Sequence, residues 1–468
     1  MNRKTLLALA TFAGLGILAI IALTRPDKGE RASDRQRPIP RMDTADIGSI
    51  EVTKAGVTSI IKQDGKSYQV TAPVAYAGDE AAGKAAFEGV KKMDVSDLVT
   101  EKKEKQAEFE VDDKSGIHLV VKSKDGKVLA DLIVGKSTGP GTMVRPAGKN
   151  EVWQATGISR YMFDKNAGDW RDKSLTTFTQ NDAEQIEVLA KDGGKAIVKK
   201  TGEKVGTEDK WVVVESSQKI DKLDNAIPNG ITAHLSNWKT NEFADGVKLA
   251  DVGLEPPQLT VTVSVKGGKK VTALIGNKKG DDDYYVKVPE APQVYLVKKY
   301  NAERVVKRPI EFRDKTLCDI ADADVSEIAV NHGDNSYTIS KSGSEWKASK
   351  PAKFDLDSSK VTFASAFKDW KAQSFAEDAT PKTNGLAKPQ ATIIAKGKAG
   401  AGCTIKVGDE TKDKLNYYVM GGKSADVYLA PKWNVDRVIV KLDDIKKGSG
   451  SPAPGGPIPV AAKGPKKK

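Results

Sequence analysis

The sequence predicts an α+β fold: three tandem repeats, each a mainly antiparallel sheet with one covering amphipathic helix, after an N-terminal transmembrane helix. Two sets of strand landmarks predict the repeats. The first set has intervals of 142 (294 − 152) and 133 (427 − 294) residues: Val152, Val294 and Val427. The second has intervals of 141 (276 − 135) and 132 (408 − 276): Gly135, Gly276 and Gly408. Such a period is too long for a solenoid and suits one small domain.

An apolar stretch at the N-terminus predicts the anchor. Leu6–Leu23 is almost wholly apolar, and its length as a helix, roughly 27 Å, approaches the ~30 Å hydrocarbon layer. A cleaved signal peptide is the alternative, but its apolar region is usually about 7–15 residues and precedes a small-x-small site. We therefore expect residues 1–24 to hold an uncleaved anchor, with cleavage left open.

The flanking charges leave the membrane orientation open. Arg3 and Lys4 precede the span, and six more basic residues follow it up to Arg41. The positive-inside rule alone would keep the following chain in the cytoplasm, but long domains cross regardless of flanking charge. A short basic N-terminus before a first span resembles a signal anchor. We expect a single-pass protein of a bacterial inner membrane, with its large C-terminal part in the periplasm.

The net charge of +12 is concentrated at the two ends of the chain. Residues 1–41 carry eight basic and three acidic side chains, and residues 442–468 carry six basic and two acidic ones, which leaves +3 for the rest. A nucleic-acid interface needs clustered basic residues on a folded face, so we expect no nucleic-acid partner. Cys318 and Cys403 could pair in an oxidising compartment, but nothing in the sequence brings them together, and we expect separate, partly buried thiols.

Each repeat shows the same order of expected elements. An opening strand is followed by a hairpin that ends at an aromatic residue: Tyr68, Trp211 and Trp346. A helix comes next, with acidic residues suited to its start: Asp79, Asp224 and Asp357. Its apolar stripe at i, i+4 and i+7 predicts packing on the sheet: Ala86, Val90 and Met93; Ile231, Leu235 and Trp238; Phe363, Phe367 and Trp370. A meander of short antiparallel strands closes the repeat.

A recurring motif marks the end of the first two repeats. Trp170–Leu175 (WRDKSL) recurs 142 residues later (312 − 170) as Phe312–Leu317 (FRDKTL). Because the third repeat lacks it, we interpret the motif as a structural joint: the aromatic enters the preceding core, the leucine enters the next, and the charged residues tie the two. The predicted ranges are a basic linker over 25–42, repeats over 43–175, 176–317 and 318–445, and a disordered Gly/Pro/Lys tail over 446–468.

No residue pattern predicts chemistry. His118, His234 and His332 fall at unrelated places in their repeats, without metal-ligand spacing. Asp281–Asp283 lacks the spacing of a calcium loop and suits a solvated hairpin tip. Ser-x-x-Lys recurs at scattered places, whereas a catalytic pair would belong to one site with partner motifs; examples are Ser59–Lys62, Ser216–Lys219, Ser344–Lys347 and Ser365–Lys368. We expect a non-enzymatic protein without catalytic, cofactor-binding or metal-binding residues and without a small-molecule substrate.

The anchor, the repeats and the two WRDKSL-type motifs resemble a bacterial family of membrane-anchored repeat proteins known only as a domain of unknown function. The resemblance covers about Asp43 to Leu442, and the first repeat departs from it most, with Glu110–Asp113 where the later repeats have Gly-Leu-x-x-Pro-Gln. Members are often encoded beside gliding-motility-type ABC transporter components. The resemblance implies an accessory role in a membrane transport complex and supplies no catalytic residues.

Two functions remain open from the sequence. The first is a membrane-anchored accessory or scaffold component of an ABC-type transport complex, with a membrane protein partner. The alternative is a binding module for cell-wall glycan or another envelope polymer. Its stacking residues would be Trp153, Tyr295 and Tyr428, whose position in strands also favours core packing.

Overall fold

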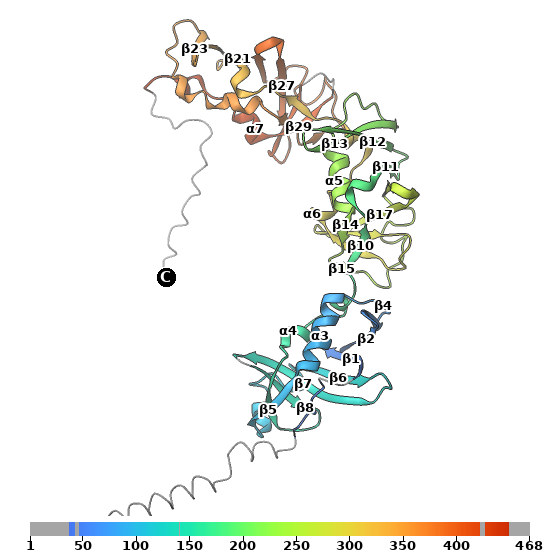
Figure 1. Ribbon diagram of the computed structural model, residues 1–468. Coiled ribbons are helices and arrows are strands. Elements are labelled where there is room, and N and C mark those ends of the chain that lie inside the picture. Colours follow the sequence, from blue (N-terminus) through green and yellow to red (C-terminus); the bar gives the residue numbers. More distant parts are fainter. Residues whose placement is uncertain (1–36, 43–45, 140, 422–425, 449–468) are drawn as a thin grey trace, which may run out of the picture. The chain divides into compact units, whose positions relative to one another are not determined.

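The computed structural model describes residues 37–42, 46–139, 141–421 and 426–448 (Figure 1). The predicted anchor, most of the basic linker and nearly all of the predicted tail lie outside these residues. No helix in the described part of the chain combines the length and the apolar character that crossing a bilayer requires.

Antiparallel sheet dominates the structure: 45% of the described residues lie in strands and 18% in helices. The prediction of an α+β fold with one covering helix in every repeat is therefore wrong. The helices are few and short, and the longest described one has 13 residues. They are α3 (Glu80–Lys92), α4 (Arg160–Phe163), α5 (Ala226–Leu235), α6 (Lys299–Ala302) and α7 (Lys432–Asp436).

The first large sheet has nine strands in the order β4-β3-β2-β1-β6-β7-β8-β9-β5. Its opening strand lies in the middle, so the N-terminal hairpins extend one side and the closing meander extends the other. The strands are β1 (Ile47–Lys54), β2 (Val57–Asp64), β3 (Ser67–Ala72), β4 (Tyr76–Ala77), β5 (Asp94–Thr100), β6 (Ile117–Ser123), β7 (Val128–Thr138), β8 (Gly141–Pro146) and β9 (Val152–Thr156).

The second and third large sheets have eight strands each and repeat this order without the short β4. The second sheet runs β13-β12-β11-β16-β17-β18-β19-β15: β11 (Ala183–Ala190), β12 (Lys195–Val205), β13 (Glu208–Ser216), β15 (Glu242–Phe243), β16 (Leu259–Val265), β17 (Lys270–Lys279), β18 (Asp283–Lys287) and β19 (Tyr295–Lys298). The third runs β23-β22-β21-β26-β27-β28-β29-β25: β21 (Val325–Asn331), β22 (Tyr337–Ser342), β23 (Glu345–Lys350), β25 (Ser374–Phe375), β26 (Ala391–Gly397), β27 (Gly402–Glu410), β28 (Asn416–Met420) and β29 (Tyr428–Pro431).

The segment after the third strand differs most between repeats. In all three, the predicted aspartate accepts a hydrogen bond from a backbone N–H at the start: Asp79 from Ala82, Asp224 from Ala226 and Asp357 from Ser359. The first repeat then continues as α3 because it is rich in alanine, the best helix former. The third has Ser, Val, Thr and Phe, which form helices less readily, and it makes only two 3₁₀ helices, η7 (Ser358–Lys360) and η8 (Thr362–Phe367).

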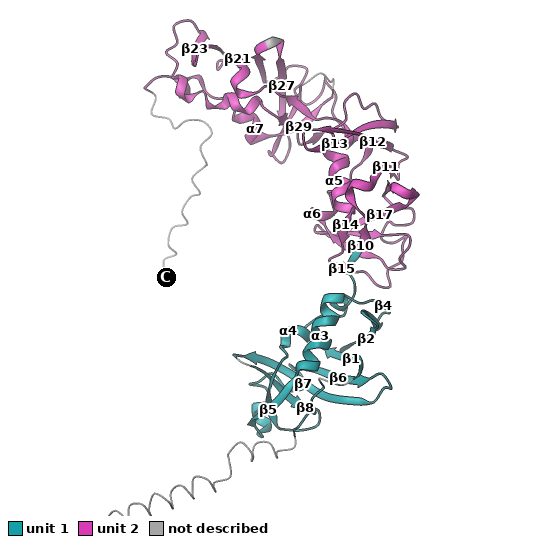
Figure 2. Ribbon diagram, in the orientation of Figure 1, with its two compact units in different colours: residues 1–174 teal, residues 175–468 magenta. Residues whose placement is uncertain are grey.

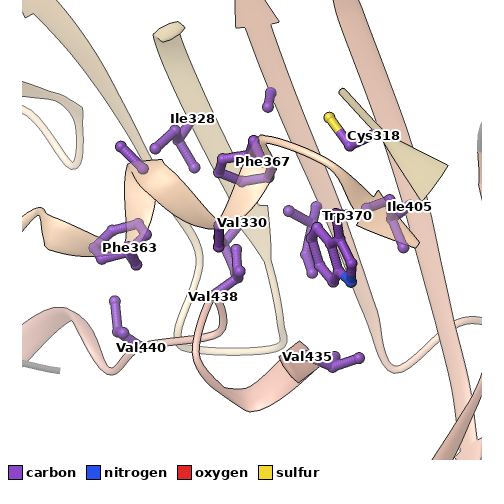
Figure 3. Packing of buried hydrophobic residues seen from close by; sticks show 14 of the residues in the cluster. Cys318, Ile328, Val330, Phe363, Phe367, Trp370, Ile405, Val435, Val438 and Val440 are labelled. Atoms are coloured by element: carbon purple, nitrogen blue, oxygen red, sulfur yellow. The ribbon is translucent and has the colours of Figure 1, made fainter. Parts of the chain in front are cut away.

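The predicted apolar stripes are buried in every repeat, whatever the local backbone. The last residue of each stripe lies beyond its helix, as Met93 does after α3. Trp238 and Trp370 lie in two short strands, β14 (Asn237–Lys239) and β24 (Trp370–Lys371). These pair with the strands that begin at the end of the recurring motif, β10 (Ser174–Thr177) and β20 (Thr316–Cys318). Figure 3 shows the third core, with Phe363, Phe367 and Trp370 packed among aliphatic side chains.

The three landmark glycines are explained by a covering loop on each sheet. A Cβ at Gly135, Gly276 or Gly408 would lie 2.2–2.4 Å from a backbone oxygen of that loop, 2.3 Å in the first, 2.4 Å in the second and 2.2 Å in the third. The residue after each glycine donates its backbone N–H to the same oxygen, on Phe109, Val252 or Asn384. Only glycine permits this approach of two backbones.

The chain divides into two compact units, residues 1–174 and residues 175–468 (Figure 2). The first large sheet belongs to the first unit, and the second and third large sheets belong together to the second unit. The predicted ranges of the individual repeats, 43–175, 176–317 and 318–445, stay a prediction.

Candidate functional site

The histidines and the acidic run Asp281–Asp283 form no shared metal or catalytic cluster in the described part of the chain. In the described part of the chain, no group of three or more His, Cys, Asp or Glu side chains could hold a metal ion. His118 pairs with Asp131 at 2.6 Å on an exposed strand surface, and the His234 ring contacts the Gly230 carbonyl within α5. Asp283 pairs with Lys298 at 3.1 Å beside its hairpin tip. These contacts are local and structural.

Two of the three aromatic residues considered for glycan stacking are buried. Tyr295 is 1% exposed and packs on Phe243, and Tyr428 is 2% exposed and packs on Phe375. Trp153 is partly buried against the first core. Tyr295 and Tyr428 therefore cannot present a ring face to a polymer, which corrects their proposed role.

A pocket of ≈ 520 Å³ in the first unit contains a buried arginine, but that arginine is already satisfied. Arg145 donates from Nε to the Val111 carbonyl at 2.8 Å and from Nη1 to the Lys149 carbonyl at 3.0 Å, and it pairs with Asp113. Its guanidinium fixes the covering loop to the sheet, so the pocket offers no buried unpaired cation to a ligand.

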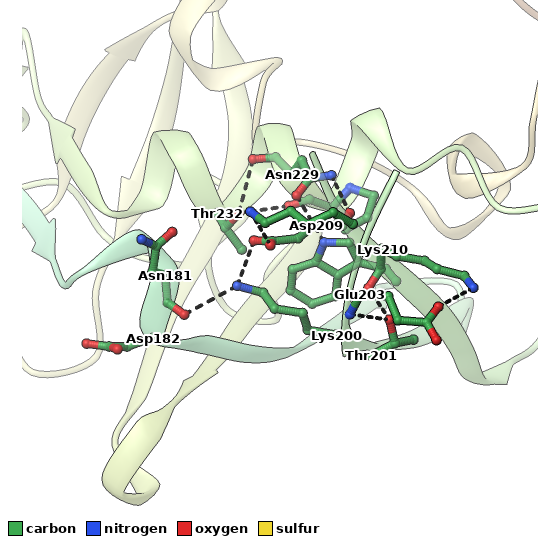
Figure 4. Close-up of polar contacts among 12 residues, drawn as sticks. Asn181, Asp182, Lys200, Thr201, Glu203, Asp209, Lys210, Asn229 and Thr232 are labelled. Atoms are coloured by element: carbon green, nitrogen blue, oxygen red, sulfur yellow. Dashed lines mark hydrogen bonds and ion pairs between the residues drawn. The ribbon is translucent and has the colours of Figure 1, made fainter. Parts of the chain in front are cut away.

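A polar network that includes Lys200, Asp209 and Asn229 is also structural (Figure 4). The Trp211 indole N–H donates to Asn229 Oδ1 at 3.1 Å, and Asn229 Nδ2 donates to the Asp209 carbonyl at 2.8 Å. Hydrogen bonds from Lys204 and Lys200 hold the pKa of the Asp209 carboxyl below its usual value. The hydrogen bonds of this network join α5 to the β12–β13 hairpin, and its polar groups bond to one another. The network therefore holds the helix in place and does not indicate a ligand site.

The recurring motif lies in a closing segment that all three repeats share. Each segment begins with a 3₁₀ helix whose last residue is buried: η2 (Ala167–Trp170), η5 (Pro309–Phe312) and η10 (Leu442–Ile445). In each, the carbonyl of that last residue accepts a 2.8 Å hydrogen bond from the backbone N–H of the aspartate at the helix start: Asp79, Asp224 and Asp357. The third repeat therefore keeps the backbone of the motif, with Ile445-Lys446-Lys447 in place of the aromatic, Arg and Asp. Only the side chains are particular to the first two copies.

The hydrophobic part of the joint prediction is confirmed where the structure tests it. Trp170 lies in the first core and Leu317 lies in the third core. Phe312, which is fully buried, belongs to a 3₁₀ helix that contacts α5 and β11 of the second repeat. The aromatic residue thus closes its own repeat, and Leu317 belongs to the repeat that follows.

Arg313 and Asp314 of the second copy form ion pairs with different repeats. Arg313 reaches the third repeat, where it pairs with Asp426 and its guanidinium lies 4.9 Å from the Phe375 ring centroid. Asp314 stays in its own repeat, pairs with Lys222 and accepts from the Thr316 N–H at 3.1 Å. Burial alone would raise the pKa of Asp314, but the hydrogen bonds from Lys222 and Thr316 hold it below its usual value. Lys315 also reaches the third repeat, with its Nζ 5.8 Å from the Phe375 ring centroid. The expectation that the charged residues tie successive repeats is therefore correct for Arg313 and Lys315 and wrong for Asp314.

Two further ion pairs among the described residues join the second and third repeats. Arg308 bonds Glu377 at 3.1 Å while also contacting Asp192 of its own repeat at 3.2 Å. Lys371 lies 3.4 Å from Asp224, the aspartate at the start of α5. We call the six bridging residues the 2–3 joint: Asp224, Arg308, Arg313, Lys371, Glu377 and Asp426. Sequence reasoning found only Arg313 among them, because the others fall outside the recurring motif.

A disulfide lies immediately after the second copy of the recurring motif. Cys318, the last residue of β20, is bonded to Cys403 on β27, across 85 residues of sequence. The expectation of two separate thiols is wrong. The pairing arises because β20 packs on β27, a contact between segments far apart in the sequence that no local pattern reveals. The bond holds the strand that leaves the joint against the third sheet.

The first two closing segments lie inside regions that a protein-family model matches. A family model described as Domain of unknown function (DUF4340) matches residues 69–229 and again residues 211–389. Together the two matches cover well over half of the chain. The chain belongs to the DUF4340 family. Both DUF4340 matches contain one WRDKSL-type motif, and their starts are 142 residues apart (211 − 69), the same interval as the motif.

The first match runs from β3 into α5, and the second runs from β13 to the residues just before β26, with one copy of the recurring motif inside each. The recurring motif therefore belongs to the part of the chain that the family model matches. A search of curated proteins finds no match to the chain.

Proposed function

We propose that this DUF4340 protein is a non-enzymatic, membrane-anchored envelope protein that serves as an accessory or scaffold component of an ABC-type transport complex. The observation that carries the proposal is the 2–3 joint. Three ion pairs, a cation–π contact and an adjacent disulfide give two tandem sheets a defined connection. A scaffold needs such a connection because it must present surfaces on successive domains in a fixed relation.

Further features support the cellular setting of this proposal. The apolar stretch Leu6–Leu23 has the length of a membrane anchor. The Cys318–Cys403 disulfide suits an oxidising compartment such as the periplasm. The family resemblance supplies the association with transporter components. Together these features favour a single-pass inner-membrane protein with its repeats in the periplasm.

Crosslinking in intact cells tests the proposal. The full chain is crosslinked, purified from membranes and analysed by mass spectrometry, and we expect integral subunits of a transporter among the recovered proteins. A joint variant, Arg308→Ala with Arg313→Ala, should recover fewer of them, while Asp314→Asn, which alters a pair within one repeat, should recover as many as the wild type. Recovery of the intact protein without any membrane partner would contradict the proposal.

A further inference from the structure

The strand that follows the second copy of the recurring motif belongs to a small sheet of its own. β20 and β24 pair with each other and, among the described residues, are separate from the eight-stranded third sheet. Their register places Thr316 opposite Lys371 and Cys318 opposite Trp370. We call this pair of strands the β20–β24 ribbon. Because Lys371 is one of the joint residues and lies 3.4 Å from Asp224 of the second repeat, movement of the ribbon acts on the 2–3 joint.

Apolar packing and a disulfide hold the β20–β24 ribbon on the third repeat. Leu317 and Trp370 are 1% and 2% exposed and lie in the third core. The Cys318–Cys403 bond adds a covalent link between β20 and β27, a long strand of the third sheet. This link limits the movement of the ribbon relative to the sheet more strictly than apolar contacts do, because apolar contacts are not directional.

The second repeat has an equivalent ribbon without a disulfide. There β10 and β14 form the two-stranded sheet. Thr176 follows the motif leucine as Cys318 does, and Val271 precedes the landmark glycine by five residues as Cys403 does. Thr176 Oγ1 donates to the Leu235 carbonyl at 2.5 Å, so a hydrogen bond serves where the third repeat has a covalent one. The fold of a repeat therefore does not require the disulfide.

The two cysteines differ in their access to solvent. Cys318 is 3% exposed, whereas Cys403 is only partly buried and lies between two exposed residues of β27, Gly402 and Thr404. A dithiol reductant can therefore reach Cys403. Its first thiolate attacks Cys403 Sγ, forms a mixed disulfide there and releases Cys318 as a thiolate, which takes up a proton. Its second thiol then displaces Cys403 and closes the disulfide of the reductant, so two electrons and two protons pass to the pair.

We propose that the Cys318–Cys403 bond is a redox-sensitive fastener of the β20–β24 ribbon, which a dithiol opens in the folded protein. In the oxidised chain the ribbon is fixed, and the contacts of Arg313 and Lys371 hold the second repeat to the third. In the reduced chain the third repeat stays folded, as the second repeat does without a disulfide. The ribbon then moves, and the distance between the two repeats varies. The inference does not depend on the proposed transport role.

The test compares the purified full chain with and without dithiothreitol, in the absence of denaturant. Alkylation and mass spectrometry measure how much of the bond has opened, and near-ultraviolet circular dichroism reports whether the cores remain packed. Hydrogen–deuterium exchange follows the amides of the β20–β24 ribbon, with β10 and β14 as an internal control. Single-molecule energy transfer follows the distance between the repeats, with dyes on p-acetylphenylalanine in place of the exposed residues Val214 and Leu415.

A matched control variant carries the residues of the second repeat, Cys318→Thr together with Cys403→Val. Because the second repeat folds with threonine and valine at these places, the variant should fold as well. The chain has no other cysteine, so neither the amide exchange nor the energy transfer of the variant should respond to dithiothreitol. A response in this variant would show that the reductant acts elsewhere and would overturn the proposal.

We expect dithiothreitol to open the bond in the folded wild type and to broaden the energy-transfer distribution. The ribbon amides should exchange at least about tenfold faster after reduction, because the ribbon can then open locally. The amides of β10 and β14 should exchange at the same rate in both states. A bond that stays closed without denaturant, or exchange and energy transfer that do not change once it opens, would contradict the proposal. Unfolding of the whole third repeat on reduction would also overturn it, because the bond would then be a structural staple.

Discussion

Removing the Cys318–Cys403 disulfide should strongly destabilise the third repeat. Cys318 and Cys403 enclose 85 residues of sequence, which include most strands of the third sheet and the aromatic segment that covers it. The perturbation is Cys318→Ala together with Cys403→Ala. Both cysteines are replaced so that no unpaired thiol remains.

The expected magnitude follows from the loop that the bond closes. A cross-link over about 85 residues lowers the entropy of the unfolded chain by an amount worth about 4.6 kcal/mol at 25 °C in the chain-entropy model. With a urea dependence of about 2 kcal/mol/M for a domain of this size, the unfolding midpoint of the third repeat should fall by about 2 M urea. This exceeds the effect of any single ion pair in the joint.

Urea unfolding followed by tryptophan fluorescence measures this shift. Trp370, which is 2% exposed in the third core, reports on that repeat. Reduction of the wild type with dithiothreitol should reproduce the midpoint of the variant, and the variant itself should not respond to dithiothreitol. Unfolding of the oxidised wild type and the variant at the same urea concentration would show that the disulfide does not stabilise this repeat.

Two other predictions concern the covering loop and the joint motif. Gly408→Ala should lower the free energy of unfolding in urea by about 2 kcal/mol or more, because the new Cβ would lie 2.2 Å from the Asn384 carbonyl oxygen. Gly402→Ala on the same strand, where the nearest atom to the new Cβ would be 3.4 Å away, should lower it little. Equal losses of stability in the two variants would contradict the close approach at Gly408. Because the pKa of Asp314 is lowered in the folded protein, its stabilising contribution is complete above the usual value of 3.8 and is lost as the pH falls through the lower folded-state pKa. Asp314→Asn should therefore be less stable than the wild type at pH 7, with a gap that closes in acid; a gap that does not depend on pH would disprove this role.

The repeat pattern was predictable from sequence because it depends on local features. Alternating apolar residues place β16 with every second side chain buried, from Leu259 to Val265. The spacing of Gly135, Gly276 and Gly408 correctly predicted equivalent positions in the three sheets. The reason that glycine is needed there is a backbone oxygen where a Cβ would lie, and only the three-dimensional structure shows it. The apolar stripes were likewise correct as core positions.

The errors share a physical origin in tertiary context. Burial of Phe363 and Phe367 at i and i+4 suited a helix, but a 3₁₀ backbone buries the same residues, so the pattern could not decide between them. The partners of Cys318 and Arg313 are both more than eighty residues away in sequence, and no local signal indicates such distant contacts. The exposed aromatic residues Tyr161, Tyr300 and Trp433 also carried a sequence signal, the order basic–aromatic–x–apolar–acidic–basic, but only alignment on the closing strands of the repeats brings it out.

We infer that the ion pairs of the 2–3 joint fix the second repeat to the third. Pulsed electron paramagnetic resonance can measure the distance between these repeats. The spin labels are attached at two exposed sites through Val214→Cys in the second repeat and Leu415→Cys in the third. The native cysteines are bonded to each other and leave the new thiols as the labelled groups. We predict a single narrow distance distribution in the wild type and in Asp314→Asn, and a broad one when Arg308→Ala and Arg313→Ala are combined. An equally narrow distribution in that joint variant would contradict the claim.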